Sequence, residues 1–197
     1  MDKDHISIIQ KRMQESISVK SLLLGDTDIL NTINSVANRL IETFNQHNRL
    51  WICGNGGSAA DAQHIAAEFS GRYLFDRPPL PAEALHVNTS YMTAVANDYG
   101  FDEVYARIID AMGKKGDILM GISTSGNSKN VIKAFEKAKE KEIIIVALTG
   151  GKTSKMEELS HYCIKVPSYD TPRIQEAHIM IGHILCEIVE SSLFSYK

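Results

Sequence analysis

The chain has 197 residues, of which 44% are hydrophobic, and its 21 basic and 24 acidic residues give a net charge of −3. A chain of this length supports one domain with a substantial buried core. Neither sign of charge is gathered in a long block, which argues against a nucleic-acid partner. An anionic small substrate stays open, because backbone amides and helix ends can hold phosphate.

The N-terminal segment mixes charged and apolar residues at helical spacing, so it lacks the continuous apolar stretch of a signal peptide. No run of about 18 apolar residues occurs elsewhere, which argues against a membrane span. The sequence therefore predicts a soluble, cytoplasmic protein with no membrane partner. Cys53, Cys163 and Cys186 are far apart in apolar surroundings, which favours buried free thiols over disulfides or a thiolate metal site.

Two segments of helical periodicity, 3–24 and 28–47, come first in the chain. Short apolar runs then alternate with helical segments. We expect strands at 50–53, 84–87, 117–122, 143–148 and 162–166. We expect further helices at 58–74, 90–98, 102–112, 129–141, 154–160 and 172–194. This alternation predicts an α/β fold with a parallel five-stranded sheet covered by helices on both faces.

The connector Arg77-Pro78-Pro79-Leu80-Pro81 is short and stiff and lies within this pattern, so it marks no domain boundary. We therefore expect a single domain over residues 1–197.

Polar and often glycine-rich loops follow the expected strands. They are Gly54–Ser58, Asn88–Ser90, Ser123–Ser128 and Thr149–Gly151. Because an open parallel sheet binds ligands at the carboxyl ends of its strands, these loops predict a ligand site at that edge. The alternative is that they are ordinary turns and N-caps, which use the same residue types.

The loop Ser123-Thr124-Ser125-Gly126-Asn127-Ser128 directly precedes the expected helix 129–141. Its hydroxyls, together with free N–H groups at a positive helix end, suit a phosphate monoester. It is not a nucleotide-binding P-loop, because GxxxxGK[ST] and its lysine are absent. Gly54-x-Gly56-x-x-Ala59 formally matches the dinucleotide fingerprint. However, the second strand ends in Val87-Asn88 without the acidic ribose anchor, which disfavours a nicotinamide cofactor.

Asp61, His64 and Glu68 stand at i, i+3 and i+7 in the helix expected after the first loop, so they share one face. His64 and Glu68 could converge on one divalent metal ion. On an isolated helix such a pair more often forms a solvated, salt-bridged face. Here the helix begins at a ligand loop, which favours a functional reading.

The last expected helix carries Gln175, His178 and His183 among Ile and Leu. Two histidines beside a glutamine are candidates for an acid/base or metal role, although His178 could equally be a solvated neighbour.

Five segments together resemble the bacterial phosphoheptose isomerases of the SIS (sugar isomerase) family in order and spacing. They are Cys53–Ser58, Asp61–Glu68, Ala96–Asp98, Gly121–Ser128 and Arg173–Glu176. The resemblance covers nearly the whole chain. It implies a three-layer αβα SIS fold and a homotetramer. It also implies isomerisation of D-sedoheptulose 7-phosphate to D-glycero-D-manno-heptose 7-phosphate, the first step toward ADP- or GDP-heptose for lipopolysaccharide or related glycans.

The resemblance also implies site residues. The substrate-binding residues are Asn55, Gly56, Gly57, Ser58, Glu68, Asn97, Asp98, Ser123, Thr124, Ser125, Ser128 and Gln175. The ligands of one zinc ion per subunit are His64, Glu68, Gln175 and His183. Gln175 and His183 lie about 12 Å apart along an ideal helix, so both reach one ion only from opposed directions or from different subunits.

Ketose-to-aldose isomerisation moves a proton between C1 and C2 through an enediol, which needs a base near the carbon and an acid near the oxygens. We assign Glu68 as the catalytic base and His183 as the partner acid/base. A metal there could polarise the carbonyl, or could be structural or inhibitory.

The alternative function is a non-catalytic SIS module that binds a partner protein. Such a module has no need for Glu68 and His183 together with the hydroxyl loop. We expect the two N-terminal helices, within residues 1–48, to contribute to the oligomer interface.

Overall fold

Five short apolar segments form one parallel sheet in the computed structural model, which describes residues 5–195. The strands are β1 (Leu50–Gly54), β2 (Ala82–Ala84), β3 (Ile118–Ser123), β4 (Ile144–Thr149) and β5 (Tyr162–Lys165). Their order is β2-β1-β3-β4-β5, and every neighbouring pair is parallel. β1 and β3 are buried along their whole length because helices cover both faces. The predicted five-stranded parallel sheet is confirmed.

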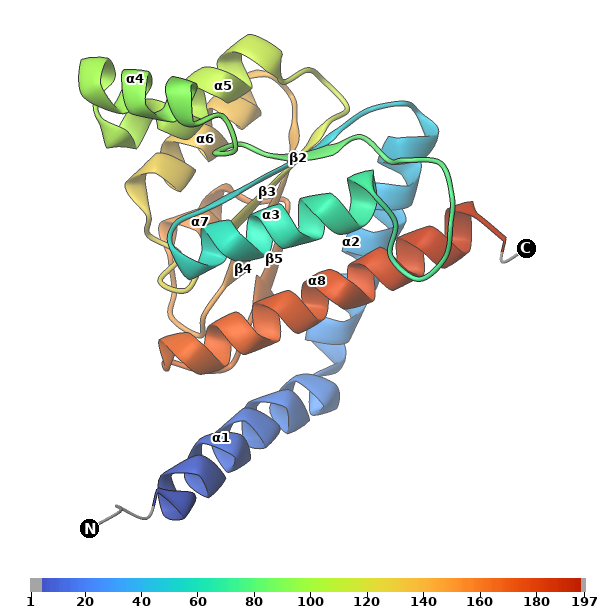
Figure 1. Cartoon of the computed structure of the whole chain (residues 1–197), viewed down its shortest axis with the longest axis vertical. Coiled ribbons are helices and arrows are strands. Elements are labelled where there is room, and N and C mark those ends of the chain that lie inside the picture. The colour runs from blue at the N-terminus through green and yellow to red at the C-terminus, as the bar shows by residue number, and fades with distance from the viewer. Residues whose placement is uncertain (1–4, 196–197) are drawn as a thin grey trace.

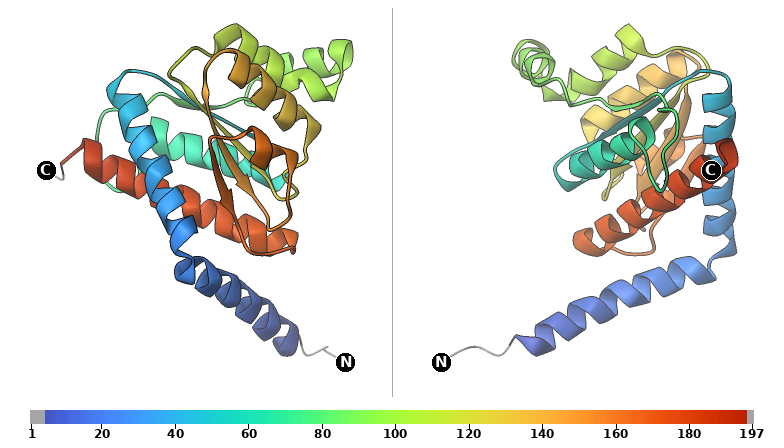
Figure 2. Two further views of the ribbon diagram at one scale, coloured as in Figure 1. Left: turned by 180° about the vertical axis from the view of Figure 1, so that it is seen from behind. Right: turned by 45° about the vertical axis from the view of Figure 1, so that its right-hand side comes forward.

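Helices form the outer two layers (Figure 1). They are α1 (Ile6–Gly25), α2 (Thr27–Asn45), α3 (Gly57–Ser70), α4 (Thr89–Tyr99), α5 (Val104–Met112), α6 (Lys129–Glu140), α7 (Lys155–Leu159) and α8 (Thr171–Leu193), with a 3-10 turn, η1 (Phe101–Glu103), before α5. One core lies between the sheet and α2, α3 and α8, and a second core lies between the sheet and α5 and α6. Figure 2 shows α1 extending away from this body. Residues 3 and 4 of the expected first helix lie outside the described residues.

The second strand lies two residues earlier than the sequence pattern predicted. The apolar run 84–87 was expected to be a strand, but the strand ends at Ala84 and residues 85 and 86 form a turn. After the turn, the Asn88 side chain caps α4, accepting a hydrogen bond from the Tyr91 N–H at 3.0 Å. Leu85 is apolar because it is buried in the second core, not because it lies in the sheet.

α3 ends four residues earlier than expected, at Ser70 rather than residue 74. Gly71 follows with φ −93° and ψ −106°, which lies outside the helical region. The guanidinium of Arg77 donates hydrogen bonds to the carbonyls of Glu68 and Phe69, both at 2.7 Å. A residue of the proline-rich connector therefore closes the C-terminal end of this helix.

The only tryptophan of the chain lies at the amino end of the sheet. Trp51 in β1 is 1% exposed, and its indole N–H donates to Asp117 Oδ2 at 2.9 Å. The other oxygen of this buried carboxylate accepts a hydrogen bond from the Arg49 N–H at 2.9 Å. Asp117 thus joins the starts of β1 and β3, where Leu50 pairs with Ile118.

The three cysteines are free, with Cys53 and Cys186 buried and Cys163 half-buried, as their apolar surroundings predicted. Within residues 5–195, no helix is both long and apolar enough to cross a membrane.

Candidate active site

The loops after β3, β4 and β5 meet at the carboxyl edge of the sheet. The Gly150 N–H donates to the Thr124 carbonyl at 3.2 Å, and the Gly151 N–H donates to the Ser168 carbonyl at 3.0 Å. A pocket of about 120 Å³ opens between them. It is lined by Thr124, Ser125, Gly151, Lys152, Ser168, Tyr169, Thr171 and Ile174. The sequence pattern indicated the first three of these residues. The others carry no motif, and their only signal is their position between strand ends and the last helix.

The hydroxyl loop after β3 is compact and internally bonded. Ser123 Oγ lies 2.9 Å from Ser128 Oγ and 3.3 Å from Ser125 Oγ. Gly126 has φ +64°, and a Cβ there would come within 2.3 Å of Ser154 Oγ, so only glycine fits. Ser128 is the N-cap of α6, but its side chain makes no capping bond within residues 5–195. The serine hydroxyls therefore gather at the positive end of a helix, as a phosphate site requires.

The loop after β1 is tied to the start of α6. Asn55 and Asn130 exchange two side-chain amide hydrogen bonds, both 2.9 Å long. Asn130 is 2% exposed, and no sequence motif pointed to it. Gly56, with φ +56°, is the N-cap of α3, and Ser58 is buried at its start. The loops after β1 and β3 are thereby joined into one edge.

Two helices bring His64, Glu68 and His183 together. His64 Nε2 lies 3.2 Å from Glu68 Oε1 within α3, and 3.0 Å from His183 Nε2 on α8. One ligand atom of each residue lies within 4.8 Å of the others. The side chains of His64 and Glu68 are 51% and 24% exposed, so a solute can approach the trio.

The trio fits a metal ion. A tetrahedral zinc ion with Zn–N bonds of about 2.0–2.1 Å holds two nitrogens about 3.3 Å apart, close to the 3.0 Å between the two imidazoles. Two histidines and one glutamate also form a known catalytic zinc set, which leaves the fourth position open.

Comparison with known proteins identifies the family of the chain. The SIS domain profile matches residues 24–150. A phosphoheptose isomerase of Aneurinibacillus thermoaerophilus is 53% identical over 189 residues, which is 96% of each chain. The chain belongs to the phosphoheptose isomerase family of SIS-domain proteins.

Two solved phosphoheptose isomerase structures share the whole fold. The protein from Neisseria gonorrhoeae is 38% identical with a TM-score of 0.89, and the match covers 95% of this chain and 100% of the other. The protein from Francisella tularensis is 32% identical with a TM-score of 0.91, covering 96% of this chain and 100% of the other. These matches confirm the expected three-layer SIS fold.

Gln175, expected in this family to bind both substrate and metal, lies beside the first loop. A Cβ added to Gly57, the first residue of α3, would come 2.4 Å from Gln175 Nε2. Gly57 precedes His64 by two helical turns, about 10 Å. Within one chain Gln175 therefore lies at the ligand loop, apart from the trio. The contact of Gln175 with substrate stays a prediction. Its role as a metal ligand also stays a prediction, and it would require Gln175 to come from another subunit.

Asn97 and Asp98, the other residues expected to contact substrate in a phosphoheptose isomerase, end α4. Both are exposed, and Asn97 Nδ2 donates to Asp98 Oδ1 at 2.9 Å. α4 stands at the outer margin of the molecule (Figure 1). Their contact with substrate stays a prediction.

His178 and Asp61 lie outside the trio. His178 is fully buried, and its Nε2–H donates to the Thr149 carbonyl at 3.1 Å. Burial lowers the pKa of His178 to about 4, so the ring is neutral and supports the end of β4. Burial raises the pKa of Asp61, and the charge of His64 opposes that shift. Asp61 Oδ2 is buried without a hydrogen-bond partner among the described residues.

Proposed function

We propose that this chain is an enzyme that isomerises D-sedoheptulose 7-phosphate to D-glycero-D-manno-heptose 7-phosphate. The observation that carries the proposal is the joining of two features in one chain: a serine-rich loop at the start of α6, and the trio of His64, Glu68 and His183 on α3 and α8. The relatives compared above are named phosphoheptose isomerases, which favours the enzyme over a non-catalytic binding module.

The phosphate is the substrate group that the protein is proposed to bind most strongly. Ser123, Thr124, Ser125 and Ser128 supply hydroxyls, and the N-terminal end of α6 supplies N–H groups and a favourable dipole. Asn55 to Ser58 and Gln175 lie at the same edge and are proposed to bind the sugar hydroxyls, together with Asn97 and Asp98. This arrangement orients the chain of the sugar without an overall positive charge on the protein.

The reaction moves one proton from C1 to C2 and a second proton from the oxygen on C1 to the oxygen on C2. Glu68 is proposed to carry the carbon proton, because its carboxylate is partly exposed and has an oxygen within 4.8 Å of a ring nitrogen of His183. His183 is proposed to carry the oxygen proton, because imidazole is the side chain most often used as a general acid and base. The two transfers leave both side chains in their starting state.

His64, Glu68 and His183 are proposed to hold a zinc ion, with Gln175 of a neighbouring subunit as a further ligand. When bound, the ion would polarise the carbonyl group of the substrate. Glu68 would then serve both the metal and the substrate, as the resemblance to the family implies.

A homotetramer is proposed from the family and from the surface of α1. Several large apolar side chains of α1 are more than half exposed in the single chain: Ile6, Ile8, Ile9, Met13, Ile17, Leu22 and Leu24. Five of them, Ile6, Ile9, Met13, Ile17 and Leu24, lie on one side of the helix, and such an exposed apolar stripe favours an oligomer interface. We place the enzyme in the cytoplasm, at the first step toward ADP- or GDP-heptose for lipopolysaccharide or related glycans.

A direct assay with sedoheptulose 7-phosphate tests the function. We expect conversion to the aldose, loss of conversion after treatment with a chelator, and recovery when Zn²⁺ is added back. An absence of conversion under all three conditions would support the binding module instead.

A further inference from the structure

A buried ion pair joins the segment after α3 to α8. Arg77 Nε lies 2.9 Å from Glu190 Oε1, and both side chains are only 1% exposed. Because burying two charges costs as much free energy as their attraction returns, such a pair is weak evidence for a role in stability. The role of this ion pair is therefore better judged from the backbone groups that the two side chains bind.

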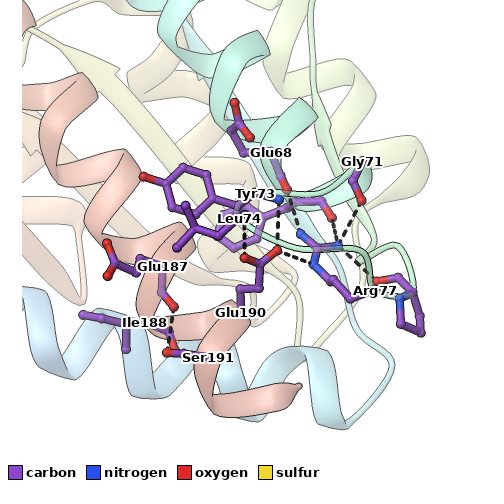
Figure 3. Close-up of polar contacts among 11 residues, drawn as sticks. Glu68, Gly71, Tyr73, Leu74, Arg77, Glu187, Ile188, Glu190 and Ser191 are labelled. Atoms are coloured by element: carbon purple, nitrogen blue, oxygen red, sulfur yellow. Dashed lines mark hydrogen bonds and ion pairs between the residues drawn. The ribbon is translucent and has the colours of Figure 1, made fainter. Parts of the chain in front are cut away.

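Arg77 gathers the backbone at the C-terminal end of α3. Its two terminal nitrogens donate to the carbonyls of Glu68 at 2.7 Å, Phe69 at 2.7 Å, Gly71 at 3.2 Å and Pro78 at 3.0 Å. Figure 3 shows the guanidinium group between these carbonyls and the carboxylate of Glu190. A guanidinium group presents five N–H donors in one rigid planar fork, enough for these carbonyls and the carboxylate together, whereas an ammonium group has only three donors. The backbone of Glu68 is thus fixed directly by Arg77.

Glu190 holds the chain that follows. Its carboxylate accepts hydrogen bonds from the N–H groups of Tyr73 at 2.9 Å and Leu74 at 2.7 Å, in addition to Arg77. Burial, the largest single influence, raises the pKa of Glu190, but the bonds from Leu74, Tyr73 and Arg77 outweigh it and leave that pKa lowered. The group is therefore a charged acceptor of fixed geometry.

A continuous series of contacts joins the Arg77–Glu190 pair to the trio. The ring of Tyr73 stacks on the ring of His183, with centroids 5.8 Å apart and planes 30° apart. His183 contacts His64, and His64 contacts Glu68, whose carbonyl is bonded to Arg77. Glu190 lies seven residues after His183 on α8, so both side chains are on the same side of that helix, two turns apart.

We propose that Arg77 and Glu190 are positioning residues, forming a clamp that sets the spacing of Glu68 and His64 on α3 from His183 on α8. The inference rests on the proposed function of that trio. An apolar pair of the same volume would fill the space, but it could not bond four carbonyls and two N–H groups.

The test replaces one member of the clamp at a time. In Glu190→Gln, we expect the Zn²⁺ affinity of the metal-free protein, measured by isothermal titration calorimetry, to fall about 10–100-fold, the range for groups that orient metal ligands. We expect kcat for sedoheptulose 7-phosphate to fall by a larger factor than KM changes, because the hydroxyl loop proposed to hold the phosphate belongs to other elements. Arg77→Lys keeps the charge but loses the fork, so it should show the same losses.

The matched control is Ile145→Ala, which opens a cavity in the second core. Ile145 is fully buried on β4, so the variant should lose thermal stability yet keep wild-type Zn²⁺ affinity and kcat at 25 °C. If Glu190→Gln does not fold, the double variant Arg77→Met with Glu190→Met removes both charges at similar volume and takes its place.

Folded clamp variants with wild-type Zn²⁺ affinity and wild-type kcat, or with a change in KM alone, would overturn the clamp while leaving the isomerase intact. If the wild-type protein binds Zn²⁺ but does not isomerise the sugar, the proposed isomerase function is wrong. The Zn²⁺ titrations of the variants then test the clamp by themselves. If the wild-type protein isomerises the sugar without binding Zn²⁺, the kcat and KM values of the variants test the clamp. A wild-type protein that does neither overturns both ideas.

Discussion

At the scale of single residues, the proposed chemistry depends most on Glu68. In Glu68→Gln the shape is kept but the base is lost, so we expect kcat to fall by about 10²–10⁴-fold, the usual contribution of a general base. Binding of sedoheptulose 7-phosphate, measured by calorimetry, should persist because the phosphate is proposed to bind at the hydroxyl loop after β3 instead. Glu83→Gln is the matched control, since Glu83 is exposed on β2. Turnover close to the wild-type rate would rule out the assignment.

His178 gives the protein a pH-dependent stability. Its folded pKa of about 4 lies below the ordinary value of 6.5, so the unfolded chain binds the extra proton more readily. The free energy of unfolding should therefore be highest above pH 6.5 and fall as the pH drops toward 4. The full loss is about 3 kcal/mol for a shift of this size.

Thermal melts of the wild type and of His178→Gln between pH 7.5 and about pH 4 measure this effect. The variant keeps a side-chain N–H that can reach the Thr149 carbonyl but has no titrating ring, so its melting temperature should depend less on pH over this range. His5→Gln, at an exposed position, should melt like the wild type at every pH. Parallel curves for the wild type and His178→Gln would contradict the assignment.

Helix geometry made part of the trio predictable. The i, i+4 spacing of His64 and Glu68 brings them together in any α-helix, and the structure places them 3.2 Å apart. The approach of His183 depends on how α8 packs on α3, which no local pattern encodes, and it came from family resemblance alone. Tyr73 and Asn130 had no signal because their partners lie far away in the sequence.

At the scale of elements, the packing of α3 on α8 depends on Gly182. A Cβ there would lie 2.5 Å from Ile65 Cδ1, and Ile65 is fully buried. Gly182→Ala gains about 1 kcal/mol of helix propensity, but overpacking costs about 1–3 kcal/mol. We expect a small net loss of stability and a lower kcat, because His183 is the next residue.

Gly25→Ala is the control for this prediction, since a Cβ at Gly25 meets nothing within 4 Å. Its kcat should equal that of the wild type. Equal kcat values for both variants, with Gly182→Ala folded, would show that the helices adjust without disturbing the trio.

The elements themselves were largely predictable, because apolar runs and helical periodicity are local properties. The exceptions have tertiary causes. The run 84–87 is apolar because Leu85 packs in a core from a turn. The helix expected over 58–74 ends at Ser70, where Arg77 of the connector donates hydrogen bonds to the last helix carbonyls. In sequence, Arg77 beside three prolines looks like an exposed linker residue.

At the scale of the whole molecule, the exposed apolar side chains of α1 offer a test of the proposed tetramer. Ile9 and Ile17 are 55% and 56% exposed in the single chain. We expect Ile9→Glu with Ile17→Glu to elute as a smaller species than the wild type in size-exclusion chromatography, with an unchanged circular dichroism spectrum. Lys11→Glu changes charge on the same helix without touching the apolar stripe, so it should elute as the wild type does. A wild-type monomer would contradict the tetramer directly.

The burial of Trp51 has a practical consequence for optical measurements. This single indole faces the core beside α5 and α6, on the opposite side of the sheet from the helices that carry the trio. Its fluorescence should change sharply when the sheet melts and stay constant when sugar or metal binds. Intrinsic emission is therefore a clean reporter of unfolding for every variant described above, while ligand titrations need calorimetry or an added dye.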